Sequence, residues 1–340
     1  MPAPSLVDVT TTAQDSARPD LVQTGQPADA AASSPDAPVD DAGTVEQRAP
    51  RRPSLSPSRA ADFKTCPLLY RFRTIDRLPE RKSLAAVRGT LVHSVLERLY
   101  DLPARERTAD AARELVAPAW EELRADPEVA ALFAEGGAAD DAPAEQTPEA
   151  ASLEAWLASA GKLVETYFSL EDPSRIEPDG REELVEVTLP DGLLLRGFVD
   201  RLDVAPNGAI RVVDYKTGAM PREAFEGKAL FQMKFYALVL WRTRGVVASQ
   251  LKLLYLGDGD ALTYAPDEAE LVRFERTLQA IWAAIERAVA TGDFRPNRTR
   301  LCDWCDHQAL CPSFGGTPPP FPAEAAAAAG WPTLPVVERD

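Results

Sequence analysis

Apolar residues recur every three to four positions over much of the chain, which is the spacing that places them on one face of an α-helix. The first such stretch follows Ser56, a good N-cap, and Pro57, which suits the first helical position, so a helix is predicted from there toward Phe72. Further helices are expected over residues 85–100, 107–124, 150–170, 225–242 and 267–291. Helices are therefore expected both before and after the middle of the chain.

The pattern changes after residue 183, where short runs rich in Val, Ile and Leu replace the helical spacing. These runs cover residues 184–189, 193–204 and 209–215, and Asp-Gly and Asn-Gly pairs separate them, as in consecutive hairpins. A further strand is expected over residues 250–256. The order of helices, three strands, helix, strand and helix predicts an α/β fold around a small mixed sheet with flanking helices.

The two ends of the chain differ in composition from the middle. Residues 1–53 consist mostly of small or polar residues and Pro, and residues 315–340 are rich in Ala and Pro, so neither segment has the apolar residues that a core requires. We expect both segments to be disordered and the folded domain to span residues 54–314. We place an acidic helical insertion at about residues 101–180, with a polar linker over residues 135–150.

The net charge of −16 argues against indiscriminate binding to nucleic acid or anionic membranes, but the charge is unevenly distributed. Residues 51–98 carry eleven Lys or Arg against four Asp or Glu (+7), whereas residues 101–190 carry seven against twenty-two (−15). The basic stretch is either a local surface that faces phosphates or ordinary solvated helix charge. No window approaches eighteen apolar residues and no secretory leader is present, so we expect a cytoplasmic protein without a membrane span.

An acid and a lysine stand two positions apart in the third expected strand. Positions i and i+2 of a strand share a face, so Asp214 and Lys216 project together while Tyr215 points the other way. A carboxylate can hold Mg²⁺, and an ammonium group can orient the attacking water or offset negative charge, as metal-dependent phosphodiester hydrolysis requires. Asp200, at the end of the preceding strand, can come beside Asp214 through the hairpin. The alternative is a surface hairpin with a salt bridge.

Three residues on expected helices are further candidates. His93, one of two histidines, shares a helix face with Glu97 and is either a metal ligand or a structural residue. Gln232 and Tyr236 are also four positions apart, on the helix that follows the Asp-Tyr-Lys strand. They either face the site and touch a nucleic-acid strand or cap the sheet.

Three of the four cysteines lie close together toward the end of the chain. Cys302, Cys305 and Cys311 form a C-x2-C-x5-C pattern, and Cys66 lies in the first expected helix. A two-residue gap lets two thiolates bind one metal centre, so a structural zinc and an iron–sulfur cluster are both open, beside buried free thiols. The absence of a G-x-x-x-x-G-K-[ST] loop excludes an ATPase motor of that type.

The motifs LSPSRAADFKTCPLLYRFR, RGTLVHSVLERLY, GFVDRLD, VVDYKTG and QMKFYAL, followed by the cysteine pattern, resemble the RecB-like nucleases of the PD-(D/E)XK superfamily. The resemblance covers about residues 54–312 and implies a restriction-endonuclease-like α/β core. It also implies an active site that uses Mg²⁺ or Mn²⁺, in which Lys216 activates water and a Gln-x-x-x-Tyr motif is present. The matching residues are His93, Asp200, Asp214, Lys216, Gln232 and Tyr236.

Relatives with one upstream cysteine and three terminal ones carry a [4Fe–4S] cluster that joins the two ends of the nuclease domain. Cys66, Cys302, Cys305 and Cys311 match that arrangement. The CRISPR-associated exonucleases and the AddB-type helicase–nuclease subunits are similar in this respect, although this chain has no helicase motor. The resemblance therefore implies iron rather than zinc.

The resemblance predicts a metal-dependent DNA exonuclease in DNA repair or recombination, acting on single-stranded DNA or DNA ends. A helicase or a CRISPR integration complex is a plausible partner, and no membrane is involved. One alternative is a non-catalytic DNA-binding or scaffold subunit of such a complex, and another is a structural-zinc protein with an accidental D-x-K. The basic residues of the first helix, Arg59, Lys64, Arg71 and Arg73, are expected to flank the groove, and Arg71 and Arg73 are expected to bind DNA.

Overall fold

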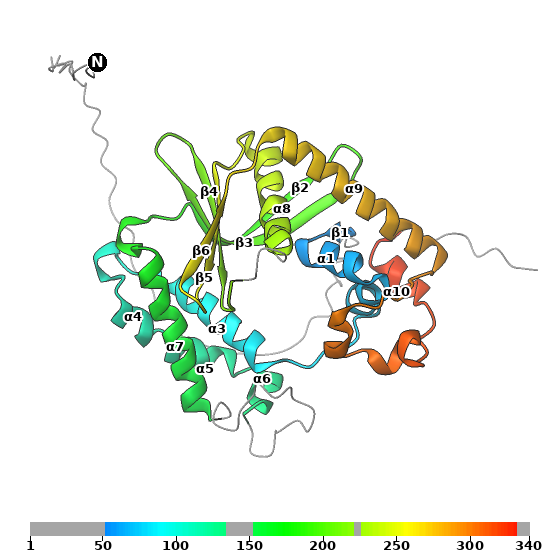
Figure 1. Cartoon of the computed structure of the whole chain (residues 1–340), viewed down its shortest axis with the longest axis horizontal. Helices are drawn as coiled ribbons and strands as arrows, with labels where there is room; N and C mark the ends of the chain where they lie inside the picture. The colour runs from blue at the N-terminus through cyan, green and yellow to red at the C-terminus, as the bar shows by residue number, and fades with distance from the viewer. Residues whose placement is uncertain (1–51, 134–151, 221–225, 332–340) are drawn as a thin grey trace, which may run out of the picture. The chain divides into compact units, whose positions relative to one another are not determined.

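The described residues, 52–133, 152–220 and 226–331 of this computed structural model, fold around one mixed sheet (Figure 1). Strand β3 pairs in parallel with β1, β4 pairs in parallel with β5, and the other pairings are antiparallel. The order is β1-β3-β4-β5-β6, with β2 on the opposite edge of β3. The strands are β1 (Ser54–Leu55), β2 (Gly180–Thr188), β3 (Leu194–Val204), β4 (Ile210–Lys216), β5 (Gln250–Tyr255) and β6 (Asp260–Tyr264). The predicted mixed α/β fold is confirmed.

The predicted hairpins turn at glycines in the left-handed region. Gly192 and Gly208 have φ values of +91° and +82°, which only glycine adopts without strain. The sequence did not predict β1 or β6. The first is only two residues long, and β6 has no fully buried residue, so neither leaves a clear apolar pattern.

Helices cover both faces of the sheet (Figure 1). The longer ones are α3 (Leu84–Leu99), α7 (Leu153–Leu170), α8 (Glu226–Arg244) and α9 (Glu268–Thr291). The shorter ones are α1 (Pro57–Thr65), α2 (Pro67–Tyr70), α4 (Ala109–Glu114), α5 (Val116–Leu123), α6 (Pro127–Ala131) and α10 (Ala323–Ala328). A π-helical turn, η1 (Arg71–Asp76), and 3₁₀ turns at η2 (Ala104–Glu106), η4 (Pro173–Arg175), η6 (Arg300–Trp304), η7 (Gln308–Leu310) and η8 (Pro312–Phe314) complete the elements. None of the described helices combines the length and apolarity that a membrane span requires.

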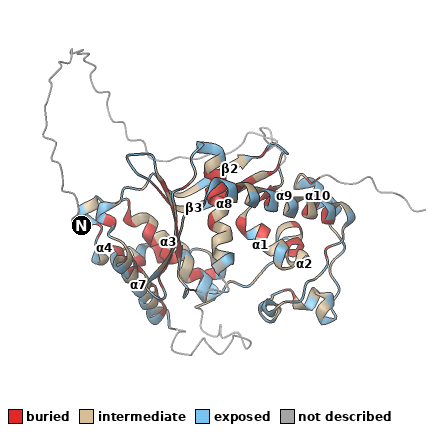
Figure 2. Ribbon diagram, turned by 45° about the horizontal axis from the view of Figure 1, so that its top comes forward, coloured by how far each residue is buried: buried red, intermediate tan, exposed pale blue. Residues whose placement is uncertain are grey.

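The buried residues form two cores, one on each face of the sheet (Figure 2). Alternation along β4 separates them, because Val212 packs into the core beneath α8 and α9 whereas Val213 packs into the core beneath α3 and α7. The second core also contains side chains of α4 and α5. The acidic stretch that we interpreted as an insertion therefore supplies one of the two helical layers.

The first predicted helix is broken in the structure. Ser56 caps α1 as expected, since its side chain accepts a hydrogen bond from the Arg59 amide. Cys66 then adopts an extended conformation (φ −159°, ψ 112°), and α2 begins at Pro67. A residue before proline is disfavoured in the helical region, so a continuous helix to Phe72 was wrong. The helix predicted over residues 107–124 is likewise divided into α4 and α5.

The segment after residue 314, expected to be disordered, is ordered as far as residue 331. Two aromatic side chains anchor it, with Phe321 stacked on Phe294 and Trp331 stacked on Trp282 at 4.9 Å between ring centroids. An Ala- and Pro-rich composition conceals these anchors, because two rings are enough to attach a short segment. Residues 1–51, 332–340 and the polar linker lie outside the described residues.

Candidate active site

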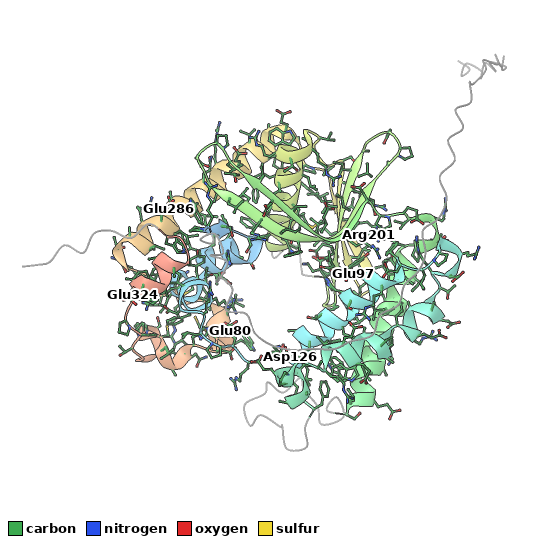
Figure 3. All side chains as sticks on the ribbon, turned by 180° about the vertical axis from the view of Figure 1, so that it is seen from behind. Glu80, Glu97, Asp126, Arg201, Glu286 and Glu324 are labelled. Carbon is green, nitrogen blue, oxygen red and sulfur yellow. The ribbon has the colours of Figure 1, made fainter. Side chains whose placement is uncertain are left out.

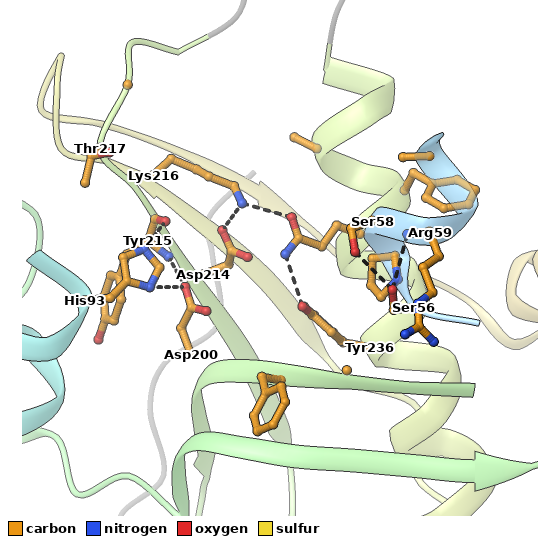
Figure 4. A pocket seen from close by; sticks show the side chains of 18 of the residues that line it. Ser56, Ser58, Arg59, His93, Asp200, Asp214, Tyr215, Lys216, Thr217 and Tyr236 are labelled. Carbon is orange, nitrogen blue, oxygen red and sulfur yellow. Dashed lines mark hydrogen bonds and ion pairs between the residues drawn. The ribbon is translucent and has the colours of Figure 1, made fainter. Parts of the chain in front are cut away.

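The candidate site lies where β3 and β4 separate. Residues 201–204 of β3 pair with β4, and Leu194 and Leu195 pair with β1 on the same edge. Among the described residues no strand pairs with residues 196–200 on that edge. A cavity of about 1150 Å³ opens at this gap, between the start of α1, residues 196–200 of β3, the end of β4, and α8 (Figure 4).

Asp214 and Lys216 project together into this cavity, as the alternation along β4 predicted. The Lys216 Nζ atom lies 2.6 Å from Asp214 Oδ2 and donates a hydrogen bond of 2.9 Å to Gln232 Oε1. Asp214 is almost fully buried, and apart from this ion pair its Oδ2 atom accepts no hydrogen bond from the described residues. A buried carboxylate oxygen with a single cationic partner can accept a metal ion as a second one.

Asp200 and His93 lie beside this pair. Asp200 Oδ2 accepts a hydrogen bond of 2.7 Å from the Tyr215 amide, which joins it to β4. His93, on α3, places Nδ1 3.5 Å from Asp200 Oδ2 and 3.5 Å from Glu182 Oε1, and its Nε2 lies 3.0 Å from the Tyr215 carbonyl oxygen. Within the described part of the chain, one group of three His, Cys, Asp or Glu side chains has metal-binding atoms that all lie within 4.8 Å of one another. This group consists of His93, Glu182 and Asp200.

The electrostatics of this cluster favour a positive charge. Burial, and then the negative charge of Asp214, raises the pKa of the Asp200 carboxyl group. Burial alone would lower the pKa of His93, but its hydrogen bond to Glu182 and the charges of Asp200 and Asp214 raise it overall. The cluster therefore retains protons that a divalent cation would displace.

Gln232 and Tyr236 form the wall contributed by α8. Gln232 Nε2 donates a hydrogen bond of 3.1 Å to the Tyr236 hydroxyl, so a chain of contacts runs from Asp214 through Lys216 to this tyrosine (Figure 4). Burial raises the pKa of Tyr236, which keeps the phenol neutral. Gly197 is required for this packing, because a Cβ atom there would lie 2.9 Å from the Tyr236 ring.

The prediction that Arg71 binds DNA was wrong. Arg71 is 5% exposed, and its Nη2 atom donates hydrogen bonds to the carbonyl oxygens of Pro319 and Pro320 at 2.6 and 3.0 Å. Its Nε atom pairs with Asp76 at 3.0 Å. The π-helical turn directs this side chain inward, where it holds the C-terminal segment.

The other basic residues of the first helical region differ in position. Arg73 is partly exposed but is paired with Asp62 and Glu80, each at 2.7 Å, and it is not among the residues that line the cavity. Lys64 lies over the Phe231 ring at 4.3 Å. Arg59 does line the cavity, and it projects from the start of α1 on the wall opposite the carboxylates (Figure 4). Of the four residues predicted to flank the groove, Arg59 is the one that lines the cavity.

Sequence reasoning missed Glu182 and Arg196. A signal for Glu182 was present, since the Asp-Gly turn fixes a register in which residues 181 and 183 pair with residues 201 and 199. Residue 182 therefore lies opposite Asp200. Its φ of +43° interrupts the regular strand at this point. Arg196 lines the cavity from β3, four residues before Asp200.

The four cysteines lie in one region, where the end of α1 meets the segment after α9. The Asn297 amide donates a hydrogen bond of 3.4 Å to Cys66 Sγ, and the Thr299 amide donates one of 3.3 Å to Cys302 Sγ. Burial raises the pKa of Cys305, a hydrogen bond from the His307 backbone lowers it in part, and the charges of the other three cysteines raise it further. No three of the sulfur atoms lie within 4.8 Å of one another in the described chain, whereas tetrahedral zinc would hold thiolates about 3.8 Å apart. The thiols are therefore neighbours but do not form a closed zinc site.

The family model described as the PD-(D/E)XK nuclease superfamily matches residues 54–312. The "Gene 69 protein" of Mycobacterium phage D29 is 26% identical over 292 residues, which cover 77% of this chain and 97% of the phage protein. The "Gene 69 protein" of Mycobacterium phage L5 is 32% identical over 129 residues, 36% of this chain and 41% of that protein. A crystal structure described as a "Putative exonuclease" from Eubacterium rectale aligns with a TM-score of 0.46 and 14% identity, over 75% of this chain and 87% of the other.

Proposed function

This chain belongs to the PD-(D/E)XK nuclease superfamily, and on that premise we propose that it is a metal-dependent DNA exonuclease. The observation that carries the proposal is the meeting of Asp200, Asp214, Lys216 and His93 at one end of a large cavity. We propose further that it acts on DNA ends in repair or recombination, in the cytoplasm, with a helicase or an integration complex as partner.

Asp200, Asp214 and His93 would hold the cation, Mg²⁺ or Mn²⁺, with Glu182 beside them. The burial of Asp214 and the raised pKa of Asp200 support this fit, because both groups gain from a positive charge. When bound, such an ion polarises the phosphate and lowers the pKa of a bound water. The His93 nitrogen makes the ligand set better suited to Mn²⁺ than a set of oxygens alone would be.

The side chains of the protein then position the reactants. Lys216 would orient the attacking water and offset the negative charge that develops on the phosphate, and Gln232 holds its ammonium group in place at 2.9 Å. Tyr236 in turn fixes the Gln232 amide. Arg59, on the opposite wall, would bind a neighbouring phosphate of the strand.

We also propose that Cys66, Cys302, Cys305 and Cys311 bind a [4Fe–4S] cluster. Their common neighbourhood and the amide hydrogen bonds to Cys66 and Cys302 support it, because such bonds to sulfur stabilise cluster thiolates. The resemblance, and not the spacing of the sulfur atoms, is the reason for proposing iron rather than zinc. The cluster would join α1 to the C-terminal segment.

The test of the nuclease proposal uses end-labelled linear DNA, single- and double-stranded, and a covalently closed circle, each incubated with Mn²⁺ or Mg²⁺. An exonuclease degrades the linear molecules and leaves the circle intact. Loss of the circle at a comparable rate would indicate an endonuclease, and an absence of cleavage with both ions would overturn the proposal.

A further inference from the structure

Two large apolar side chains on the β2–β3 hairpin are exposed to solvent, next to the carboxylates of the candidate active site. Phe198 is 55% exposed and Leu184 is 40% exposed, and the two residues are directly opposite each other in the strand register. Phe198 lines the same cavity as Asp200 and Asp214. Single exposed apolar residues are ordinary, but an adjacent pair at the edge of an active-site cavity indicates a surface that binds a ligand.

The residues of β3 that approach the site alternate in a regular way. Residues 195, 197 and 199 are buried, whereas Arg196 and Phe198 are exposed and Asp200 is partly exposed. Since alternate residues of a strand are about 6.6 Å apart, a cation, an aromatic ring and a metal-binding carboxylate follow one another along the strand. The Arg196 side chain is 44% exposed and its Nε atom lies 3.9 Å from Glu186 Oε2, so the guanidinium group is accessible to an anion.

A nucleic-acid strand presents the same alternation of phosphate charge and flat apolar surface. In a duplex the faces of the bases are covered by their neighbours, so an isolated side chain such as Phe198 can stack only on an unpaired or terminal base. Aromatic rings beside a cationic groove are the usual means of binding single strands without sequence preference. Arg59 on the opposite wall adds a second cation to the cavity.

We propose that Phe198 is a stacking platform for an unpaired base next to the scissile phosphate, and that Arg196 binds the adjoining phosphate. The active site then selects single-stranded DNA. This inference rests on the proposed function, because it concerns the substrate of that same site.

The test measures DNA binding in the presence of a chelator, so that no cleavage occurs. Dissociation constants are obtained for a labelled single-stranded oligonucleotide and for the blunt duplex of the same sequence. Phe198→Leu keeps an apolar side chain without a ring and should weaken single-strand binding by roughly 5- to 100-fold, with a much smaller effect on the duplex. Phe198→Trp should retain single-strand binding, and Val246→Ala, at a 43% exposed site that does not line the cavity, should change neither.

A second arm locates the stacked base. Binding of oligonucleotides with one abasic position is compared for the wild-type protein and Phe198→Leu. When the missing base is the one that stacks on the Phe198 ring, the losses of affinity from the abasic position and from the substitution should not add. Arg196→Gln should lower single-strand affinity and reduce its salt slope by about one.

The inference is overturned if Phe198→Leu binds single strands as well as wild type does, or weakens both DNA forms equally. It is also overturned if no abasic position removes the effect of the substitution. These results are separable from the nuclease proposal. A protein that cleaves DNA but is insensitive to residue 198 would overturn only this inference, and one that binds as expected but never cleaves would overturn only the nuclease proposal.

Discussion

Tyr215 shows how one residue of β4 assembles the site from both sides of the strand. Its amide binds Asp200, its carbonyl oxygen lies 3.0 Å from His93 Nε2, and its hydroxyl accepts a hydrogen bond of 3.0 Å from Arg201 on the opposite face. Asp214 and Lys216 on either side of it are thereby directed into the cavity. The position of each chemical group thus depends on the alternation of a single strand.

Replacing Lys216 by Ala, or Asp214 by Asn, should reduce cleavage by at least about 10²- to 10³-fold, because positioned charge commonly contributes that much to the rate. Both side chains serve the cavity and not the apolar cores, so circular dichroism of the variants should match that of wild type. Lys162→Ala, an exposed lysine on α7, is the control and should keep full activity. Wild-type rates in both variants would contradict the assignment.

The raised pKa values give the site a dependence on pH. Burial and the charge of Asp214 raise the pKa of Asp200 to about 7, and the pKa of His93 is also raised, so the folded, metal-free protein holds protons that the unfolded chain releases. Their stabilising contribution is present at low pH and is lost as the pH rises through these values. A divalent cation replaces the protons, so the increase in Tm on adding Mn²⁺ should be larger at pH 8 than at pH 6. An equal increase at both pH values, or an unchanged pH dependence in Asp200→Asn, would refute this explanation.

At the residue level, the sequence was informative where a role depends on backbone geometry. Alternation was sufficient to place Asp214 beside Lys216, and the hairpin register could also have placed Glu182 opposite Asp200. Arg71 could not be predicted in the same way. Its side chain is buried because a π-helical turn and a distant C-terminal segment enclose it, and neither leaves a local pattern.

At the level of elements, β3 connects the active site to the helical layer behind the sheet. Arg201 follows Asp200 directly and is fully buried where the sheet meets α3 and α7 (Figure 3). Its guanidinium group pairs with Asp203 at 3.0 Å and Glu171 at 2.8 Å. It also donates hydrogen bonds to the hydroxyls of Tyr100, Tyr167 and Tyr215. The spacing of apolar residues predicts the helices and strands. It cannot show that a charged residue, Arg201, lies at the centre of the contact between the sheet and the helices.

Arg201→Met should lower the free energy of unfolding by about 3–5 kcal/mol, because it removes the fully buried cation of the cluster. Asp203 then keeps Arg211 as its partner and Glu171 keeps Lys252, but neither of these cations is as deeply buried as Arg201. Denaturant titration followed by circular dichroism measures the change. Arg105→Met removes a largely exposed arginine that is paired with its neighbour Glu106 and should cost less than about 1 kcal/mol. Equal losses of unfolding free energy in the two variants would show that the buried cluster stabilises the fold no more than an exposed ion pair does.

On the scale of the whole molecule, the two ends of the described chain are joined beside the nuclease core. His307 Nε2 donates a hydrogen bond of 3.0 Å to Glu80, which lies where the two segments meet (Figure 3), and Asn297 contacts both Thr65 and Cys66. Arg71 holds the following segment. The sequence predicted this junction only through the cysteines, because their spacing matches a known pattern. The other contacts join residues more than two hundred positions apart and leave no pattern in the sequence.

Cys311→Ser should lose the proposed cluster and, with it, the cross-link between the ends. Closing a loop of this length stabilises a fold by at most about 4–5 kcal/mol, so we expect a colourless protein with a lower unfolding midpoint. Iron analysis and the visible spectrum of anaerobically prepared protein provide the measurement, with Asp303→Asn as a control in the same segment. One zinc and no iron in the wild-type protein would contradict the cluster but not the nuclease.

We propose that Asp200, Asp214 and His93 hold one divalent cation, and that Lys216 orients the water that hydrolyses DNA at this ion. The most direct measurement is the release of nucleotides from end-labelled linear DNA during a Mn²⁺ titration, for wild type, Asp214→Asn and Lys216→Ala. We predict that Mn²⁺ is required, that Asp214→Asn shifts the titration to higher Mn²⁺ concentrations at a reduced maximum, and that Lys216→Ala lowers the maximum by at least about 10²-fold. Nucleotide release that is independent of Mn²⁺, or titrations that coincide for all three proteins, would contradict the claim.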